Sequence, residues 1–417
     1  MQTESDSRPD RFRRQAIQPE EAQALIQNRV GALPAEKLQL AEAWGRTLAE
    51  PLVAPHPFPP FRRSGMDGYA VRSADLREAT SEHPLLLDVV ESLPSGVAPK
   101  REIGSGQAAR IMTGGMVPTG ADAVVILEAT RQVENGRVHI GKPALPGQHI
   151  SEIGSEIAQG ETLLPAGTVI QAGETALLAA CGYAFVSVAK RPRIAILSTG
   201  SELLGIEDSL APAKIRNSNL PMLAALIREA GAEPIVLGNV PDDLRKTEKL
   251  IRDALPDCDL LLTTGGVSVG DYDVMVDVLG SPDAEKLFDK IAMRPGSPTS
   301  AAIMDGKLLL ALSGNPGACF VGFHLFAKPA IRRMLGAKQL QAARIEAYLD
   351  EPFTKVNAFK RFIRGRLRYD EGKVFVAPTG EDKSSLMTTI VGADCLIEIP
   401  PLKTALDAGQ LVTVWKL

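Results

Sequence analysis

Apolar and polar positions alternate with two different periods over residues 191–336. Short, almost continuous apolar runs have the length of strands that are buried on both faces of a sheet. Between them lie helical patterns at residues 222–230, which end before a glycine, and at residues 242–255, which begin with acidic residues. This alternation predicts a parallel α/β layer sheet. The predicted strands are residues 193–197, 234–237, 260–264 and 308–312.

The segments on either side of this region have other patterns. A helix is predicted from Pro19, because a proline in the first turn is followed by acidic residues and an apolar stripe. A second helix is predicted at residues 35–48. Residues 56–147 and those after Gly336 contain short apolar runs separated by turns, which predict β-rich domains, the latter a small barrel or sandwich. The proline-rich residues 54–60 predict a stiff linker.

Composition narrows the class of protein. Of the 417 residues 45% are apolar and 23% are charged, and the net charge of −4 offers no basic field for nucleic acid. No apolar run has the length that spans a membrane. The first 14 residues are polar and lack the apolar stretch of a signal peptide, so we expect a disordered leader. Four widely spaced cysteines (Cys181, Cys258, Cys319 and Cys395) are expected to be reduced, which favours a cytoplasmic location.

The end of one predicted strand carries the strongest chemical signal. The run Leu260-Leu-Leu-Thr-Thr-Gly-Gly-Val-Ser-Val-Gly-Asp271 passes from apolar residues into glycines, hydroxyl residues and a carboxylate. Glycines let backbone N–H groups approach a phosphate closely, and the carboxylate is a ligand for a divalent cation. Ligands of such sheets bind at the carboxyl ends of the strands. Glycine-containing loops follow all the predicted strands, at residues 198–202, 238–243, 264–271 and 313–317, which predicts a site for a phosphorylated small molecule.

Several motifs in one order resemble the molybdopterin molybdenumtransferase family, which includes the bacterial enzyme and the C-terminal domain of gephyrin. The likeness runs from about residue 15 to the C-terminus. Two motifs are Ser64-Gly-Met-Asp-Gly-Tyr-Ala-Val-Arg72 and Met293-Arg-Pro-Gly-Ser-Pro298. The others are residues 110–125, 192–203, 264–272 and 313–316.

The resemblance implies a mixed α/β multidomain fold. A split helical/β domain would cover residues 15–55 and 148–189, with a β-rich domain of residues 56–147 inserted in it. A three-layer parallel α/β domain, similar to molybdopterin adenylyltransferases, would cover residues 190–336, and a β-barrel residues 337–417.

The resemblance also implies an activity and an assembly. Family members insert molybdate into adenylylated molybdopterin and release AMP, with Mg²⁺ as the cation. They are homodimers whose active sites lie between the α/β domain of one subunit and the inserted domain of the other. A transient contact with a molybdopterin adenylyltransferase is also expected.

Three carboxylates match the acidic positions of the family on the α/β sheet. These are Glu202, Asp242 and Asp271, which we expect to act in catalysis and to hold Mg²⁺, because a hard cation prefers oxygen ligands. The alternative is structural: Asp242 would only cap the helix that begins there, and Glu202 would lie in an ordinary first turn.

Two loops are candidates for binding the substrate's phosphates. Thr264, Gly265, Gly266 and Ser268 would cradle them through N–H and hydroxyl groups, unless this is only a structural tight turn. The second loop contributes Gly314, Asn315 and Pro316.

Further site residues come from the resemblance. It makes Asp67, with Thr113 beside it, an active-site residue supplied across the dimer interface; the alternative is a common turn aspartate before glycine.

Lys290 and Arg294 would offer positive charge to phosphate or molybdate, or would be solvated surface charges. Pro295 indicates that they lie in a strand end or loop. Arg364 and Ser384 match an anion-binding region of the C-terminal domain, although Arg364 stands in a basic cluster of residues 360–368.

Some positions depart from the family pattern. An acidic and an amide residue are usual where Arg62 and Arg63 stand, lysines are usual where Arg294 and Ser297 stand, and a proline is usual where Ser313 stands. These changes leave open a non-catalytic carrier or scaffold that holds molybdopterin species. A nucleotidyltransferase is a third hypothesis, but that family uses the α/β unit alone. The discriminating observation is whether the candidate carboxylates meet in one cleft with a basic group nearby.

Overall fold

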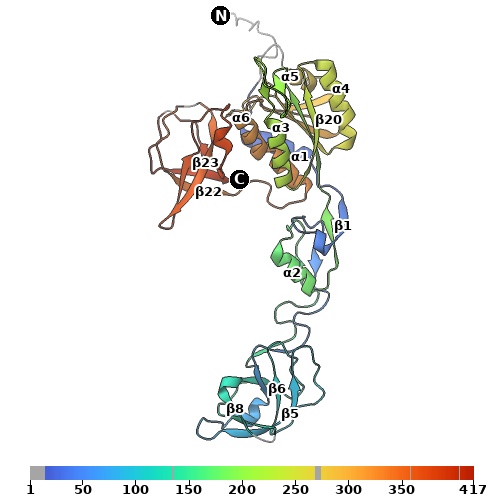
Figure 1. The fold of residues 1–417 in the computed structure, drawn as a ribbon, viewed down its shortest axis with the longest axis vertical. Coiled ribbons are helices and arrows are strands. Elements are labelled where there is room, and N and C mark those ends of the chain that lie inside the picture. The colour runs from blue at the N-terminus through green and yellow to red at the C-terminus, as the bar shows by residue number, and fades with distance from the viewer. Residues whose placement is uncertain (1–14, 134–135, 268–273, 357, 403) are drawn as a thin grey trace, which may run out of the picture. The chain divides into compact units, whose positions relative to one another are not determined.

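The computed structural model describes residues 15–133, 136–267, 274–356, 358–402 and 404–417, which fall into two compact units (Figure 1). Of the described residues, unit 1 contains 15–49, 167–171 and those within 185–417. Unit 2 contains residues 50–166 and 172–184. Each unit has a hydrophobic core of its own.

Unit 1 is built around a mixed β-sheet. In sheet order its strands are β16 (Glu233–Val240), β13 (Arg193–Thr199), β17 (Leu260–Thr264), β21 (Lys307–Leu312), β20 (Ser300–Met304) and β18 (Ala284–Phe288). The first four run parallel and confirm the strands predicted from apolar runs, whereas β20 and β18 continue the sheet antiparallel. The sequence analysis missed β20 and β18, because their residues are small or partly charged rather than continuously apolar.

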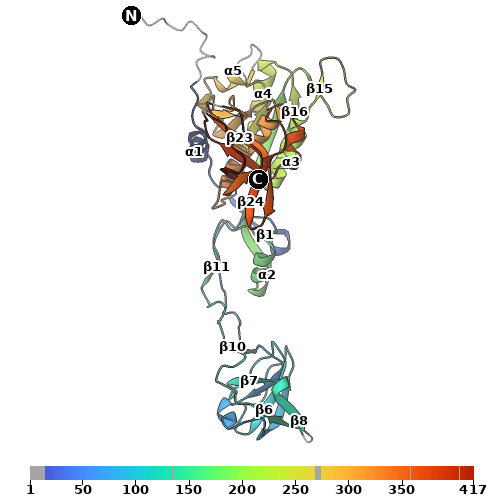
Figure 2. The same ribbon diagram turned by 90° about the vertical axis from the view of Figure 1, so that its left-hand side faces the viewer.

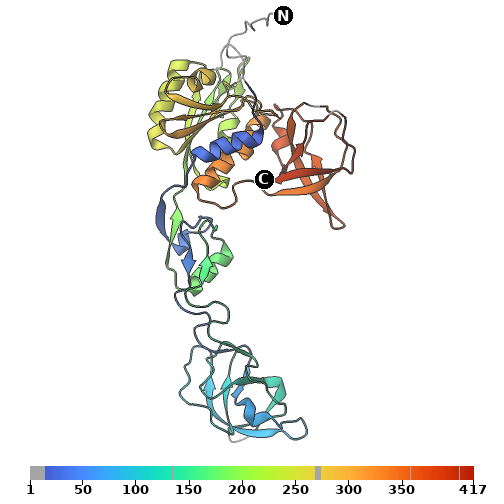
Figure 3. The same cartoon turned by 180° about the vertical axis from the view of Figure 1, so that it is seen from behind.

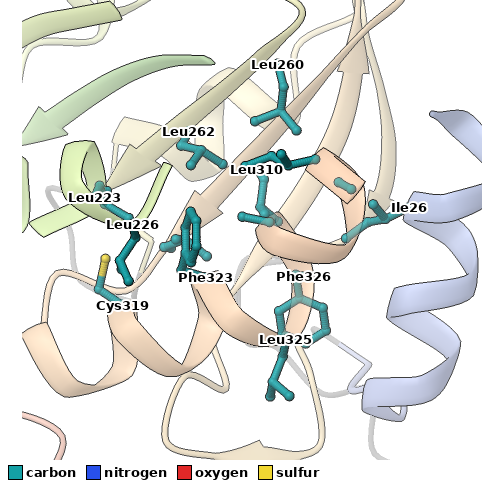
Figure 4. Close-up of a cluster of buried hydrophobic side chains, with 14 of the residues drawn as sticks. Ile26, Leu223, Leu226, Leu260, Leu262, Leu310, Cys319, Phe323, Leu325 and Phe326 are labelled. Atoms are coloured by element: carbon teal, nitrogen blue, oxygen red, sulfur yellow. The ribbon is translucent and has the colours of Figure 1, made fainter. Parts of the chain in front are cut away.

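Helices cover both faces of this sheet (Figure 3). On one face lie α1 (Pro19–Arg29), α3 (Asn219–Glu229), α6 (Pro316–Gly322), the π-helix η6 (Phe323–Ala327) and α7 (Lys328–Met334); on the other lie α4 (Leu244–Ala254) and α5 (Val274–Leu279). Leu260 and Leu262 of β17 join the first core, against Leu223 and Phe323 (Figure 4), and Leu261 joins the second. The layers are therefore helix, sheet and helix. None of the helices in the described ranges combines the length and apolarity that crossing a bilayer requires.

Residues 35–48 do not form the predicted second α-helix. They contain β1 (Ala35–Gln39) and the 3-10 helix η2 (Leu40–Glu42). Strand β1 pairs antiparallel along its whole length with β12 (Phe185–Ala189). The residue types of β1 favour a helix in isolation, but its backbone hydrogen bonds to β12 override that weak preference.

The C-terminal part of unit 1 is a closed β-barrel. Its strands are coloured orange and red in Figure 2. Its strands are β22 (Arg344–Leu349), β23 (Lys360–Asp370), β24 (Lys373–Pro378), β25 (Cys395–Ile399) and β26 (Leu411–Lys416). The order β23-β24-β22-β26-β25 closes through the pairing of β25 with β23. The short strand β19 (Met293–Arg294) also pairs with β23, which ties the barrel to the α/β layers. The predicted barrel or sandwich is therefore a barrel.

Unit 2 contains another β-sheet, as its short apolar runs predict. In sheet order its strands are β7 (Ala123–Ile126), β4 (Gly68–Val71), β6 (Gln107–Ile111), β5 (Leu85–Leu93), β9 (Arg137–Ile140) and β8 (Thr130–Val133). Other elements of this unit are β2 (Leu52–Val53), which pairs with β11 (Thr162–Leu164), β3 (Arg63–Ser64), which pairs with β10 (Ile150–Ser151), and α2 (Ala172–Ala180).

Gly68 sets the closest backbone approach in the sheet of unit 2. A Cβ atom at this position would lie 1.9 Å from the carbonyl oxygen of Val125 on the neighbouring strand β7. We expect Gly68→Ala to lower the free energy of unfolding of this unit by about 2 kcal/mol, because a backbone contact cannot be relieved by a rotamer change. Denaturant unfolding of the full chain measures it.

Gly173→Ala is the matched control for Gly68→Ala. Gly173 lies in α2 of the same unit, and a Cβ there would meet nothing within 4 Å among the described residues. This change should be neutral or slightly stabilising, since alanine has the higher helix propensity. Equal stability of both variants would contradict the close approach at Gly68.

Candidate functional site

The carboxyl ends of the parallel strands open into a cleft of about 1330 Å³ within unit 1. All four strand-end loops that were singled out from the sequence contribute lining residues, the loop of residues 238–243 through Asp242. The barrel contributes Arg361 and residues of the segment 382–387. The position matches the usual ligand site of an α/β sheet, and the volume exceeds the usual range of small-molecule pockets, about 300–1,000 Å³.

The glycine loop after β17 lines the cleft. Gly265 and Gly266 have φ angles of 97° and 61°, and a Cβ on Gly265 would lie 2.3 Å from the carbonyl oxygen of Thr199. Glycine is therefore required for both conformation and space. Thr264 and the two glycines line the cleft together, whereas Ser268 lies outside the described residues.

A buried asparagine joins the two phosphate-loop candidates. The amide nitrogen of Asn219 donates to the hydroxyl of Thr264 at 2.8 Å and to the carbonyl oxygen of Gly314 at 2.8 Å. The hydroxyl of Thr264 in turn donates to the carbonyl oxygen of Ser313 at 3.0 Å. Sequence reasoning missed Asn219, although an asparagine at the start of an amphipathic helix, beside a sheet's ligand edge, was an available signal.

Two of the predicted carboxylates, Glu202 and Asp242, line the cleft. Asp242 accepts hydrogen bonds from the backbone N–H and the hydroxyl of Ser201, at 3.2 and 3.1 Å. It does not cap α4, so the structural alternative is wrong: Asp243 is the N-cap and accepts from the N–H of Lys246 at 3.1 Å. In the described part of the chain, neither Glu202 nor Asp242 has an ion-pair partner.

The third predicted metal ligand, Asp271, lies outside the described residues. Among the residues that are described, no cluster of three His, Cys, Asp or Glu side chains is placed to hold a metal. Three described carboxylates line the cleft. Since Asp382 is paired with Arg361, Glu202 and Asp242 remain as oxygen donors for a hard cation that takes its other ligands from phosphate and water.

Basic side chains surround these carboxylates. Those that line the cleft are Lys214, Arg216, Arg294, Arg361 and Lys383. Arg361 is paired with Asp382, and the ammonium of Lys214 donates to the carbonyl oxygen of Ser201 at 2.5 Å. Arg294 is exposed in β19, and its guanidinium has no hydrogen-bond or ion-pair partner among the described residues. The cleft therefore offers positive charge that a phosphate or oxyanion can neutralise.

The predicted basic residues Lys290 and Arg294 differ in position. Arg294 lines the cleft, and Lys290 does not. Arg294 belongs to β19, which pairs with β23 of the barrel, whereas Lys290 lies outside this strand. Ser297, at a position where the family usually has lysine, lines the cleft and donates its hydroxyl to the carbonyl oxygen of Ile291 at 2.8 Å.

Arg364 supports the wall of the cleft from behind. Its side chain is 1% exposed and donates to the hydroxyl of Thr389 and to the carbonyl oxygen of Lys383, both at 3.0 Å. Burial lowers the pKa of this guanidinium. Ser384, which lies in the segment that Arg364 holds, lines the cleft and accepts from the amide of Asn315 at 3.3 Å. Gly314, Asn315 and Pro316 also line it.

Unit 2 brings Asp67 and Thr113 together. One carboxylate oxygen of Asp67 accepts from both the backbone N–H and the hydroxyl of Thr113, each at 2.7 Å. These bonds, the backbone one first, hold the pKa of Asp67 below its usual value, and Arg110 acts in the same direction. Asp67 is exposed, so it is an ionised and oriented carboxylate at the surface of its unit.

The unusual arginines of unit 2 have partners. Arg62 pairs with Glu152 at 3.2 Å, and Arg63 pairs with Glu156 at 2.6 Å. Each of these positive charges, which the family usually lacks at positions 62 and 63, is therefore neutralised by a neighbouring glutamate.

Comparison with known proteins gives three family matches that together cover most of the chain. The families described as "MoeA N-terminal region (domain I and II)", "Probable molybdopterin binding domain" and "MoeA C-terminal region (domain IV)" match residues 17–182, 195–333 and 346–417.

Similar full-length proteins carry one name. The molybdopterin molybdenumtransferase of Bacillus subtilis (strain 168) is 42% identical over 382 residues, which is 91% of this chain and 89% of the relative. That of Staphylococcus aureus (strain MSSA476) is 40% identical over 402 residues, 96% of each chain. The crystal structure of the molybdopterin biosynthesis moeA protein from Pyrococcus horikoshii OT3 is similar with a TM-score of 0.83 and 29% identity, covering 97% of this chain and all of that one.

Proposed function

This chain belongs to the molybdopterin molybdenumtransferase family, and from that membership and the cleft we propose that it inserts molybdate into adenylylated molybdopterin and releases AMP. Its general role is that of a transferase in molybdenum cofactor biosynthesis. The identity of the activated substrate and the leaving group are the parts that we propose.

The observation that carries the proposal is the composition of the cleft. It places a glycine loop, the carboxylates of Glu202 and Asp242, and an arginine whose side chain has no partner among the described residues around one space. The glycine loop presents backbone N–H groups to phosphate oxygens, and Arg294 offers charge to phosphate or to the molybdate anion. A site for a neutral ligand would not need this arrangement.

We further propose that Glu202 and Asp242 hold Mg²⁺, together with Asp271. The first two are oxygen donors without ion-pair partners among the described residues, which fits a hard cation. When bound, Mg²⁺ would neutralise charge on the phosphate oxygens and so favour cleavage of the phosphate linkage. The protein's own part is to orient the substrate: Thr264 and Gly265 hold the phosphates, and Arg294 holds the oxyanion.

The proposed assembly is a homodimer with composite active sites. The support is that unit 2 carries an exposed and oriented carboxylate, Asp67, which accepts two hydrogen bonds from Thr113 and has no ion-pair partner among the described residues. In a two-fold dimer the same surface of each subunit contributes to both sites. We also propose a transient contact with a molybdopterin adenylyltransferase, which would hand over the activated substrate.

A carrier without catalytic activity is the second candidate. The observation that favours it is Ser297, which places a neutral hydroxyl in the cleft at a position where the family usually has a lysine. A weaker positive field would still bind molybdopterin species but would stabilise charge developing in the reaction less well.

One experiment separates the two. Purified protein is incubated with adenylylated molybdopterin and Mg²⁺, with and without molybdate, and AMP is measured by chromatography. We expect AMP release that depends on molybdate and stops when EDTA removes Mg²⁺. Tight binding of the nucleotide without release would support the carrier instead, and absence of binding would contradict both.

A further inference from the structure

The segment that carries Arg294 into the cleft is held by two parts of unit 1 that are distant in the sequence. The backbone of Ile17, just before α1, makes hydrogen bonds with residues 290 and 292, at 3.1 and 2.8 Å. The strand β19 pairs with Lys360 and Arg361 at the start of β23. We call residues 17–20, 290–294 and 360–361 the junction. Since Arg294 lines the cleft, the junction determines where this arginine enters it.

A network of ion pairs connects the two parts that hold β19. The ammonium of Lys360 pairs with the carboxylate of Glu20 in α1 and, at 2.7 Å, with that of Glu398 in β25. Glu398 also accepts from the indole N–H of Trp415 at 2.6 Å. The side chains of Lys360 and Glu398 are only 19% and 15% exposed, so salt screens their attraction less than that of an exposed ion pair. Burial opposes the charge of Lys360, but its bonds to the two glutamates outweigh this effect and raise its pKa.

The backbone of the junction is also fixed by packing and by a local pair of hydrogen bonds. Ile291 and Phe362 belong to the hydrophobic core of the α/β layers, as does Trp415. The N–H of Ile291 donates to the carbonyl oxygen of Ser297 at 2.8 Å, and the hydroxyl of Ser297 donates back to Ile291. The guanidinium of Arg294, in contrast, has no partner among the described residues. Its position therefore depends on the backbone that carries it.

We propose that Lys360 is a positioning residue for the cleft, because its ion pairs with Glu20 and Glu398 fix the junction from which Arg294 enters. The inference rests on the proposed function in one respect, the role of Arg294 in holding the molybdate anion. Without the ammonium, Glu398 would keep the N–H of Trp415 as its hydrogen-bond partner in the described part of the chain. A partly buried carboxylate that has lost its cation is costly, so the start of β23 would shift relative to α1.

The alternative is that the network only stabilises the fold. In that case its loss would lower the free energy of unfolding but would leave the affinity of the folded protein for an anion unchanged. Arg29 offers the matched control, because it lies in the same helix α1 and pairs with Glu285 of β18. Its replacement, like that of Lys360, removes one cation and one link of α1, but the lost link does not lead to the barrel.

Two measurements on the full chain test the proposal. Equilibrium dialysis with molybdate alone gives a dissociation constant without turnover, and hydrogen–deuterium exchange with mass spectrometry follows peptides that cover residues 290–297. We expect Lys360→Met to weaken molybdate binding at least about tenfold and to speed this exchange at least about tenfold. Arg294→Met should weaken molybdate binding as much but leave the exchange unchanged. Lys360→Arg should restore both values, because it keeps the charge, and Arg29→Met should alter neither.

Every outcome of these measurements bears on the proposal. Unchanged exchange or unchanged molybdate affinity in Lys360→Met would overturn it, as would equal effects of Arg29→Met or absence of molybdate binding by the unchanged protein. If Lys360→Met fails to fold, Glu20→Gln at an exposed position of α1 should give the same two changes to a smaller extent, and no change would overturn the proposal. Failure of the proposed function would appear separately, as a lack of AMP release, while dialysis and exchange still decide the role of Lys360.

Discussion

Gly265→Ala should lower molybdate-dependent AMP release by at least about 100-fold while the protein stays folded. The added Cβ would lie 2.3 Å from the carbonyl oxygen of Thr199, at a φ angle of 97° that side chains rarely adopt. The loop must therefore move away from β13, and Thr264 beside it would lose its bond to Asn219 or Ser313. A displacement of about 1 Å in a phosphate cradle is enough for an effect of this size. Steady-state AMP release measures it.

Gly238→Ala is a closely matched control for this prediction. Gly238 has a φ angle of 98°, but a Cβ there would meet nothing within 4 Å among the described residues, and the residue does not line the cleft. It should carry a similar conformational strain, roughly 1–2 kcal/mol, with activity close to that of the unchanged protein. If both variants lose activity equally, general destabilisation and not the shape of the loop is the cause. If Gly265→Ala remains fully active, the glycine loop is not the phosphate cradle.

The predictability of the fold depended on how each element is stabilised. The parallel strands, such as β17, are buried on both faces, so they consist of continuous apolar runs that can be recognised in the sequence. The strand β18 lies at the edge of the sheet and has exposed charged residues, so its sequence carries no such run. Residues 35–39 form a strand because β12 pairs with them. This partner lies about 150 residues away, so it cannot be predicted from the local sequence of residues 35–39.

The candidate site, like the fold, was only partly predictable from the sequence, because some of its residues are positioned by contacts between distant segments. The glycine loop and the loop that ends at Asp242 were singled out because strand-end loops of a parallel sheet converge on one edge, whereas Asp242 itself was chosen by its match to the family. The sequence alone could not decide which of the adjacent acids caps α4, and the structure assigns that task to Asp243 and leaves Asp242 in the cleft. Arg361 and Lys383 line the cleft from the barrel region, whereas Lys290 does not line it. These positions depend on strand pairing between distant segments, such as β19 with β23, which the local sequence does not encode.

From the proposed homodimer we expect that a heterodimer with Asp67→Ala in one subunit and Asp242→Ala in the other recovers about half of the activity of the unchanged protein. Each change alone should lower AMP release at least about 100-fold, because every site of such a dimer lacks an oriented carboxylate. In the heterodimer, one composite site combines both changes and the other has neither. Co-expression with two affinity tags, followed by purification over both, isolates the heterodimer, and light scattering confirms its mass.

The controls for the mixed dimer test the geometry and not only the activity. Doubly tagged dimers of each single variant should stay inactive, which excludes recovery through contamination or subunit exchange. Thr113→Ala combined with Asp242→Ala in opposite subunits should also recover activity, because Thr113 orients Asp67 through its hydroxyl and belongs to the same unit. If neither heterodimer recovers AMP release, Asp67 and Asp242 of one active site must belong to the same chain. A monomeric mass for the active protein would contradict the composite site directly, since Asp67 would then have to reach the cleft of its own chain.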